Sequence, residues 1–243
     1  MAILDEIRTY WDDDAATYDD SPGHRPRSPA VQAAWTAALE ALLPPAPARV
    51  LDCGAGTGFL SLVAARLGHR VTALDLSPGM LERLRAAASA ENLDIDVVVG
   101  LAEDPPQGFD AVMERHVLWT LPDPAAALGA WRAAAPGGRL VAVESLWGAA
   151  DALERARGTA RTWLRRARGG ADDHHAPYPA DVRRALPLGS GTHPRAVAAL
   201  VAQAGWSAPR LVRLRDVEWA GSLEMALPER LLGVTPRFAV VAT

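Results

Sequence analysis

Short apolar runs alternate with amphipathic stretches between residues 48 and 145. Over residues 60–67, apolar side chains recur at the three-to-four-residue spacing that is typical of a helix packed on a core. Ser77 and Pro78 begin the next helical stretch with an N-cap serine and a proline at the first helical position. We predict strands at residues 49–53, 70–74, 94–99, 109–113 and 139–143, and helices at 77–90 and 124–133. This alternation predicts an α/β fold, with a doubly wound parallel sheet covered by helices on both faces.

The flanking segments predict a lid, a cap and a closing pair of strands. Residues 1–45 carry two helical stretches joined by a proline-rich hinge at 21–26, and residues 146–192 carry an arginine-rich helix followed by a polar, proline-interrupted loop. A helix at 193–204 and strands near 209–219 and 237–242 are expected to close the sheet as a helix and a hairpin. We interpret the chain as one domain, composed of a lid (1–45), a cofactor-binding core (46–145), a cap insertion (146–192) and a C-terminal helix and hairpin (193–243).

Composition narrows the chemistry. Hydrophobic residues make up 49% of the 243 positions and charged residues 22%, as in globular proteins, and no apolar run reaches the ~18 residues of a membrane-spanning helix. The acidic N-terminus does not resemble a secretory signal, so we expect a cytoplasmic protein. All 25 residues of the lysine and arginine class are arginine, which excludes Schiff-base chemistry on lysine and a P-loop lysine. The single cysteine, Cys53, excludes an internal disulfide and a cysteine-based metal cluster.

The segment VLDCGAGTGFL, at residues 50–60, carries the strongest chemical signal. A buried strand ends in Asp52, glycines follow at every second position, and a helix then begins. Glycines at this bend let the backbone approach a ligand closely. Asp75 ends the next strand, where it can accept hydrogen bonds from a ribose diol, and Leu76 follows where it can pack on a purine. The spacing G-x-G-x-G differs from the dinucleotide fingerprint, and Asp52 suits the cationic amino group of S-adenosylmethionine better than a pyrophosphate.

These motifs resemble the class I S-adenosylmethionine-dependent methyltransferases over most of the chain. VLDCGAGTGFL is similar to the first motif of the family, VTALDLSPGML to its second strand and helix, and the segments at 109–128 and 135–144 to its fourth and fifth strands. The resemblance implies a Rossmann-like, seven-stranded sheet whose last strand is antiparallel. One departure is Leu101, where many relatives have aspartate, so the contact with the adenine amino group falls to Glu103 or to the backbone.

The resemblance also implies roles for individual residues. Asp52, Gly54 and Gly56 would hold the methionine part of the cofactor, and Asp75 its ribose. Leu76, Ala102 and Glu103 would surround the adenine, Met80 would also contact the cofactor, and Glu114 or Arg115 would reach the methionine end. Tyr10 and Tyr18, eight residues apart, would lie on nearly one face of a lid helix; alternatively they pack aromatic rings on the core.

Methyl transfer needs an oriented acceptor more than a reactive side chain. His116, His175 and Tyr178 are the candidate catalytic residues, because His116 follows the fourth strand and the other two lie in the cap insertion. Each of the three also has a purely structural interpretation. No acidic or histidine cluster has the spacing of a metal site, so no metal is expected.

We therefore expect S-adenosylmethionine-dependent methyl transfer to nitrogen or oxygen of a small molecule, with nitrogen slightly favoured. The alanine-rich, lysine-free composition is typical of a high-GC bacterium, where such enzymes tailor secondary metabolites such as antibiotics. Two alternatives stay open: an RNA or protein methyltransferase that docks through the basic helix at 155–168, and a nucleoside-binding fold without catalysis. A net charge of −4 does not favour nucleic acid, no membrane partner is expected, and the first helices could pair two copies of the chain.

Overall fold

The computed structural model describes residues 2–21, 23–146, 152–167, 178 and 180–243. Its centre is a seven-stranded sheet in the order β3-β2-β1-β4-β5-β7-β6. Neighbouring strands from β3 to β5 are parallel, whereas β7 runs antiparallel to both β5 and β6. The strands are β1 (Arg49–Cys53), β2 (Arg70–Asp75), β3 (Ile95–Val99), β4 (Ala111–Arg115), β5 (Arg139–Ser145), β6 (Arg210–Arg213) and β7 (Arg237–Ala242). The predicted seven-stranded α/β sheet with an antiparallel last strand is confirmed.

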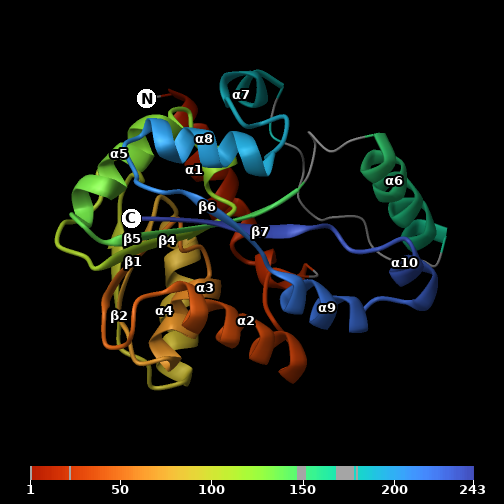
Figure 1. Cartoon of the computed structure of the whole chain (residues 1–243), viewed down its shortest axis with the longest axis horizontal. Helices are drawn as coiled ribbons and strands as arrows, with labels where there is room; N and C mark the ends of the chain where they lie inside the picture. Colours follow the sequence, from red (N-terminus) through yellow and green to blue (C-terminus); the bar gives the residue numbers. More distant parts are fainter. Residues whose placement is uncertain (1, 22, 147–151, 168–177, 179) are drawn as a thin grey trace.

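Helices cover both faces of this sheet (Figure 1). On one face lie α2 (Pro29–Leu42), α3 (Phe59–Arg66), α4 (Pro78–Ala90) and α9 (Arg215–Leu223); on the other lie α5 (Pro124–Ala134) and α8 (Pro194–Gln203). The remaining helices are α1 (Ala2–Asp14), the 3-10 turns η1 (Tyr18–Asp20) and η2 (Leu118–Thr120), α6 (Ala152–Ala167), α7 (Ala180–Ala185) and α10 (Leu227–Leu231). The two principal clusters of buried side chains fill the layers between the sheet and these two sets of helices.

Most predicted elements agree with the structure to within two residues. Ser77 caps α4 as expected, because its hydroxyl oxygen accepts a hydrogen bond from the Met80 N–H at 3.1 Å. The fourth strand begins at Ala111, two residues later than predicted.

The predicted strand at 209–219 is wrong beyond Arg213. After β6 the chain forms α9 and α10 before it enters β7, so a helical segment replaces the expected hairpin connection. Leu214, Val217 and Ala220 explain the difference, because they recur every third residue and are all buried. Within the described part of the chain, no helix is long and apolar enough to cross a membrane.

Trp131 joins α5 to the loop after β3. Its side chain is fully buried, and its indole Nε1–H donates to the Ala102 carbonyl at 2.8 Å. We expect Trp131→Phe to lower the free energy of unfolding by about 2 kcal/mol, because it removes buried volume and leaves that carbonyl without its donor. Urea unfolding monitored by circular dichroism measures this loss. Trp163→Phe on α6 is the control: its side chain is 67% exposed, so the expected change is within about 0.5 kcal/mol, and equal losses in the two variants would contradict the prediction.

Candidate functional site

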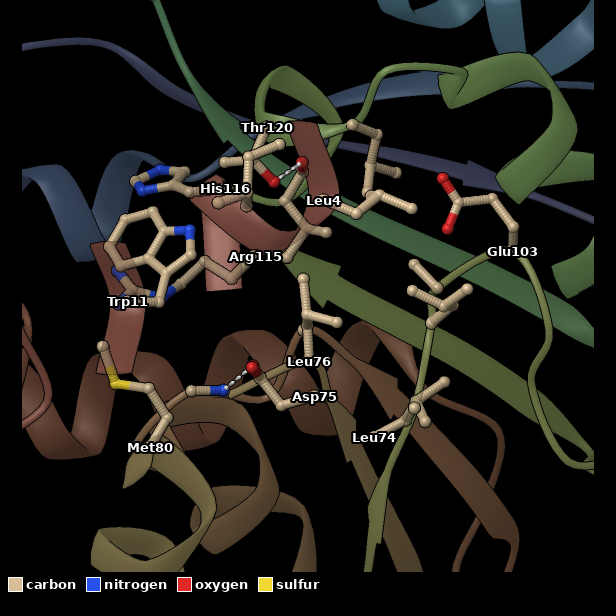
Figure 2. A pocket seen from close by; sticks show the side chains of 18 of the residues that line it. Leu4, Trp11, Leu74, Asp75, Leu76, Met80, Glu103, Arg115, His116 and Thr120 are labelled. Carbon is tan, nitrogen blue, oxygen red and sulfur yellow. Dashed lines mark hydrogen bonds between the residues drawn. The ribbon is translucent and has the colours of Figure 1, made fainter. Parts of the chain in front are cut away.

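A pocket opens at the carboxyl edge of the parallel strands, where α/β sheets bind their ligands. Its floor is built from the turn after β1, the ends of β2 and β4, and the loop after β3, and α1 covers it with Leu4, Ile7 and Trp11. Figure 2 shows Glu103 at one end of the pocket and Trp11 and His116 at the other. The free volume is about 100 Å³. This is less than the roughly 300–1,000 Å³ that ligand pockets usually measure.

The turn after β1 depends on its glycines. Gly54 has a φ of +64° and lies so close to the Val117 side chain that no Cβ could be accommodated. Gly56 has a φ of +55°, and its N–H donates to Asp75 Oδ2 at 2.7 Å. The turn thus brings the backbone after β1 against the ends of both neighbouring strands, β2 and β4.

Asp75 lies on the pocket floor at the end of β2. Its carboxylate accepts hydrogen bonds from the backbone N–H groups of Gly56 and Ser77, at 2.7 and 2.8 Å, and the first of these is drawn in Figure 2. Burial raises its pKa. A carboxylate has about four acceptor positions, so Asp75 keeps capacity for the two hydroxyls of a ribose.

Asp52 occupies a small recess that shares Tyr18, Gly54 and Arg115 with the main pocket. Its side chain is 2% exposed, and Ser61 Oγ donates to its Oδ2 at 2.6 Å. Burial raises the pKa of Asp52 to about 7. A cationic amino group bound in the recess would favour the ionised form of this carboxyl.

Side chains along β4 alternate between the two faces of the sheet, and this places Glu114 and Arg115 on opposite faces. The sequence had left these two as alternatives for reaching the methionine end of the cofactor. Arg115 points into the pocket, where its guanidinium lies 3.8 Å from the centre of the Phe59 ring and donates a long hydrogen bond, 3.4 Å, to the Gly23 carbonyl. Glu114 lies on the opposite face, completely buried and outside the pocket lining. The expectation that Glu114 contacts the cofactor is therefore not supported. Its Oε2 instead accepts the Val117 N–H at 2.9 Å and so holds the turn that follows β4.

His116 begins that turn with a φ of +61°, a conformation that is uncommon for histidine. Its N–H donates to the Val143 carbonyl at 3.0 Å, and its Nε2 lies 2.9 Å from Ser145 Oγ. Burial, together with the positive charges of Arg115, Arg237 and His24, holds the pKa of His116 well below its ordinary value. The imidazole is therefore neutral at pH 7, and the same surroundings disfavour the imidazolium that proton transfer to it would form.

The residues expected to contact the adenine, Leu76, Ala102 and Glu103, line the pocket, and Leu101 lies beside them. Met80, expected to contact the cofactor, lines it as well. Burial raises the pKa of Glu103. The Trp131 hydrogen bond to the Ala102 carbonyl fixes the backbone of this loop.

The lid differs from the prediction in one respect. Because α1 ends at Asp14, Tyr10 and Tyr18 do not share a helix, and only Tyr18 lines the pocket. Tyr10 packs against Tyr178, with their ring centroids 4.5 Å apart.

Tyr178 is buried in that aromatic cluster and does not line the pocket, and burial raises the pKa of its hydroxyl. Its catalytic role, which the sequence suggested, gains no support from this position. His175, the third catalytic candidate, lies outside the described residues. Among the residues that the structure describes, no cluster of histidine, cysteine and acidic side chains could hold a metal ion.

Two acidic residues that sequence reasoning did not select anchor the lid. Asp12 Oδ1 on α1 accepts from Ser77 Oγ at 2.5 Å and from the Gly79 N–H at 3.0 Å. Asp19 accepts from the Thr57 hydroxyl at 2.6 Å and pairs with Arg25 at 2.8 Å. The acidic N-terminal run was visible in the sequence, but nothing in it indicates which of its carboxylates reach α4 and the glycine turn.

Comparison with known proteins identifies the segment that builds the pocket floor. Residues 51–142 match the family described as "Methyltransferase domain". This segment is a methyltransferase domain. It contains both aspartates, the glycine turn and the turn at His116.

Curated relatives match less than half of the chain. A ubiquinone biosynthesis O-methyltransferase from Xanthomonas axonopodis pv. citri is 43% identical over 107 residues, which is 42% of this chain and 45% of the relative. The same enzyme from Xanthomonas campestris pv. campestris strain B100 is 44% identical over 98 residues, 38% of this chain and 41% of the relative. The chain thus spans less than half the length of these relatives.

Similar solved structures cover more of the chain than the methyltransferase domain. One, described as the conversion of a disulfide bond into a thioacetal group during echinomycin biosynthesis, has a TM-score of 0.56 and 26% identity and covers 94% of this chain and 90% of its own. A phosphoethanolamine N-methyltransferase from Haemonchus contortus, in complex with S-adenosylhomocysteine, has a TM-score of 0.62 at 14% identity, covering 98% of this chain and 59% of its own. A mitomycin 7-O-methyltransferase has a TM-score of 0.53 at 18% identity. The match covers 88% of this chain and 52% of the mitomycin enzyme.

Asp52 makes stability depend on pH. The unfolded chain ionises this carboxyl near its ordinary value of 3.8, whereas the folded protein does so at about 7. The folded state therefore binds the extra proton between these values, and the contribution of Asp52 to stability falls as pH rises from about 4 to about 7. We expect Asp52→Asn to gain stability relative to the native chain across this window, by up to about 4 kcal/mol, and to level off above it.

Urea unfolding at several pH values measures this difference. Ser61→Ala provides a companion test, because loss of its hydrogen bond to Asp52 should extend the window to higher pH. Identical pH profiles for Asp52→Asn and the native chain would contradict the prediction.

Proposed function

We propose that this protein transfers a methyl group from S-adenosylmethionine to a nitrogen or oxygen atom of a small molecule. The observation that carries the proposal is a pair of carboxyls, the buried Asp52 and the partly buried Asp75, on either side of a glycine turn in a methyltransferase domain. One carboxyl suits an amino group and the other suits a ribose diol.

The remaining pocket residues suit the other parts of this cofactor. Arg115 is positioned to pair with the methionine carboxylate, and the loop from Leu101 to Glu103 to enclose the adenine. The methyl donor supplies an activated sulfonium carbon, so the protein has to exclude water and align the acceptor. Trp11 and the other α1 residues that line the pocket cover it and would keep water out.

His116 is the residue that we assign to proton removal. A bound S-adenosylmethionine would supply the methyl carbon to the acceptor lone pair and keep the electrons of the cleaved carbon–sulfur bond on its sulfur, and the neutral imidazole of His116 would take the acceptor proton. Ser145, hydrogen-bonded to Nε2, orients the ring. A positioned base makes a hydroxyl acceptor accessible as well as an amine.

A role in natural-product biosynthesis is supported by two of the similar structures, which concern echinomycin biosynthesis and a mitomycin methyltransferase. The names of the curated relatives point instead to ubiquinone biosynthesis. Because those relatives align with less than half of this chain, whereas the echinomycin-related structure covers 94% of it, we favour a secondary metabolite as the acceptor.

Asp75 tests the cofactor assignment. We expect Asp75→Ala to lower the affinity of the protein for S-adenosylmethionine and for S-adenosylhomocysteine at least tenfold. The reason is that each lost hydrogen bond to a charged acceptor contributes about 1.5–3 kcal/mol. Calorimetric titration measures both affinities, and NAD should not bind. Asp96→Ala, which removes an exposed carboxyl from neighbouring β3, should leave both affinities unchanged. Unchanged binding by Asp75→Ala would refute the assignment.

His116 tests the mechanism. We expect His116→Asn to lower kcat by about 10²–10⁴-fold with any acceptor found in a panel of phenols and amines, because general-base catalysis contributes that much. Asparagine tolerates positive φ, so the turn should survive and cofactor affinity should stay unchanged. Formation of S-adenosylhomocysteine is the readout, and His193→Asn at the exposed start of α8 is the control. Native-like turnover by His116→Asn would exclude it as the base.

A further inference from the structure

A second cavity, of about 600 Å³, lies between the cap helices and the rest of the molecule. This volume is within the range of about 300–1,000 Å³ that ligand pockets occupy. Its walls come from the hinge, α2, α6, α9, α10 and the residues that lead into β7, all outside the methyltransferase domain at 51–142. Figure 1 shows α6 and α10 standing beside α9, at the end of the sheet where β7 begins. Apolar side chains line much of this α6–α10 cavity, namely those of Val31, Val217, Met225, Ala226 and Val234.

Two helical glycines leave this space open. Gly158 on α6 and Gly221 on α9 both line the cavity, and a glycine inside a helix costs about 1 kcal/mol relative to alanine. Packing does not require either of them. A Cβ at Gly221 would meet nothing within 4 Å, and one at Gly158 would meet only Arg161 Nη2 at 3.8 Å. Neither glycine has a positive φ. What both preserve is the volume of the cavity.

Arg237 connects this cavity to the candidate active site. It lines the cavity, and as the first residue of β7 it pairs in register with Ser145, the residue hydrogen-bonded to His116. Its Nη2 would lie 3.3 Å from a Cβ placed on Gly23, whose carbonyl accepts a hydrogen bond from Arg115. Arg237 therefore belongs to the cavity, while its neighbours Arg115 and His116 belong to the nucleoside pocket.

Three carboxylates, Glu218, Glu224 and Glu229, and two arginines, Arg161 and Arg237, line the cavity. The Glu218 carboxylate accepts from the Arg213 guanidinium at 3.0–3.1 Å and from the Arg237 backbone N–H at 2.8 Å. Arg161 donates to the carbonyls of residues 232 and 233. Among the described residues, no side chain or carbonyl accepts a hydrogen bond from the Arg237 guanidinium. Burial and the nearby charge of Arg115 lower the pKa of Arg237 to about 10, and the Glu218 carboxylate opposes this shift only in part.

We propose that the α6–α10 cavity binds the methyl acceptor, and that Arg237 recognises a carboxylate on that acceptor and so places its nucleophilic atom beside His116. This inference rests on the proposed function. Arg115 would serve the carboxylate of the cofactor and Arg237 that of the acceptor. The apolar walls would hold the body of an acceptor larger than a single ring.

Binding of matched compounds tests the assignment, because it depends on the acid group and not on the exact identity of the acceptor. The probes are hydroxybenzoic and aminobenzoic acids and their two-ring analogues, each paired with its uncharged carboxamide. The protein is first saturated with S-adenosylhomocysteine, and calorimetry then measures each probe. We expect at least one acid to bind at least tenfold more tightly than its amide. Arg237→Gln should abolish that difference, and Arg237→Lys should restore part of it.

Arg213→Gln is the matched control. Arg213 is hydrogen-bonded to Glu218 but does not line the cavity. The variant should therefore keep the preference for acids over amides. If Arg237 served only to balance Glu218, the two variants would behave alike. The affinity for S-adenosylhomocysteine should be the same in all variants.

Gly221→Leu tests the location independently of charge. The new side chain has free space and improves helix propensity, so the protein should fold while acid and amide binding both fall at least tenfold. Native-like binding by Gly221→Leu, or no preference for any acid in the native protein, would overturn the inference. Failure of S-adenosylhomocysteine to bind would instead overturn the proposed function, so the two failures are distinguishable.

Discussion

The contact between Gly54 and the Val117 side chain is the constraint on which the site depends. It presses the turn after β1 against the turn after β4, so closely that only glycine fits at position 54. Glu114, buried beneath, accepts the Val117 N–H and holds the second turn from below. His116 lies between Glu114 and Val117 in the chain, with a positive φ. The cofactor side and the catalytic side of the pocket are therefore one packed unit, and a change at Glu114 reaches both without touching a ligand.

Charged side chains with little access to water favour the binding of ligands of opposite charge at this edge of the sheet. Burial raises the pKa values of Asp52 and Asp75 and lowers that of Arg115, because each charged form lacks the solvation that water would provide. A ligand that carries both an amino group and a carboxylate would compensate the recess around Asp52 and Arg115 at once. Burial also lowers the pKa of Arg237, and a carboxylate on the methyl acceptor would compensate that charge as the cofactor would compensate Asp52 and Arg115.

The sheet topology draws the cofactor-facing and the acceptor-facing residues from different parts of the chain. β1, β2 and β4 deliver the nucleoside-facing residues from within the methyltransferase domain. β7 is inserted antiparallel beside β5, so that its first residue, Arg237, lies at the edge where β5 ends at Ser145. That insertion brings residues from the end of the chain next to the turn at His116. Segments outside the domain can thus change the acceptor while the cofactor floor stays the same.

The antiparallel last strand and the adenine loop at 101–103 were expected only from the resemblance to a known family. The sequence by itself predicted the parallel part of the sheet, the glycine turn and the place of Asp75, because these follow from local periodicity and from glycines that a bend requires. It could not choose between Glu114 and Arg115, since one residue of register decides which face of β4 each occupies. Nor could it show that α1 ends before Tyr18, or that residues 215–223 are helical, because packing overrides the local pattern. Only the tertiary structure placed Asp12 on α4 and Arg237 beside Ser145. Those two contacts join residues more than sixty positions apart, and no local pattern records them.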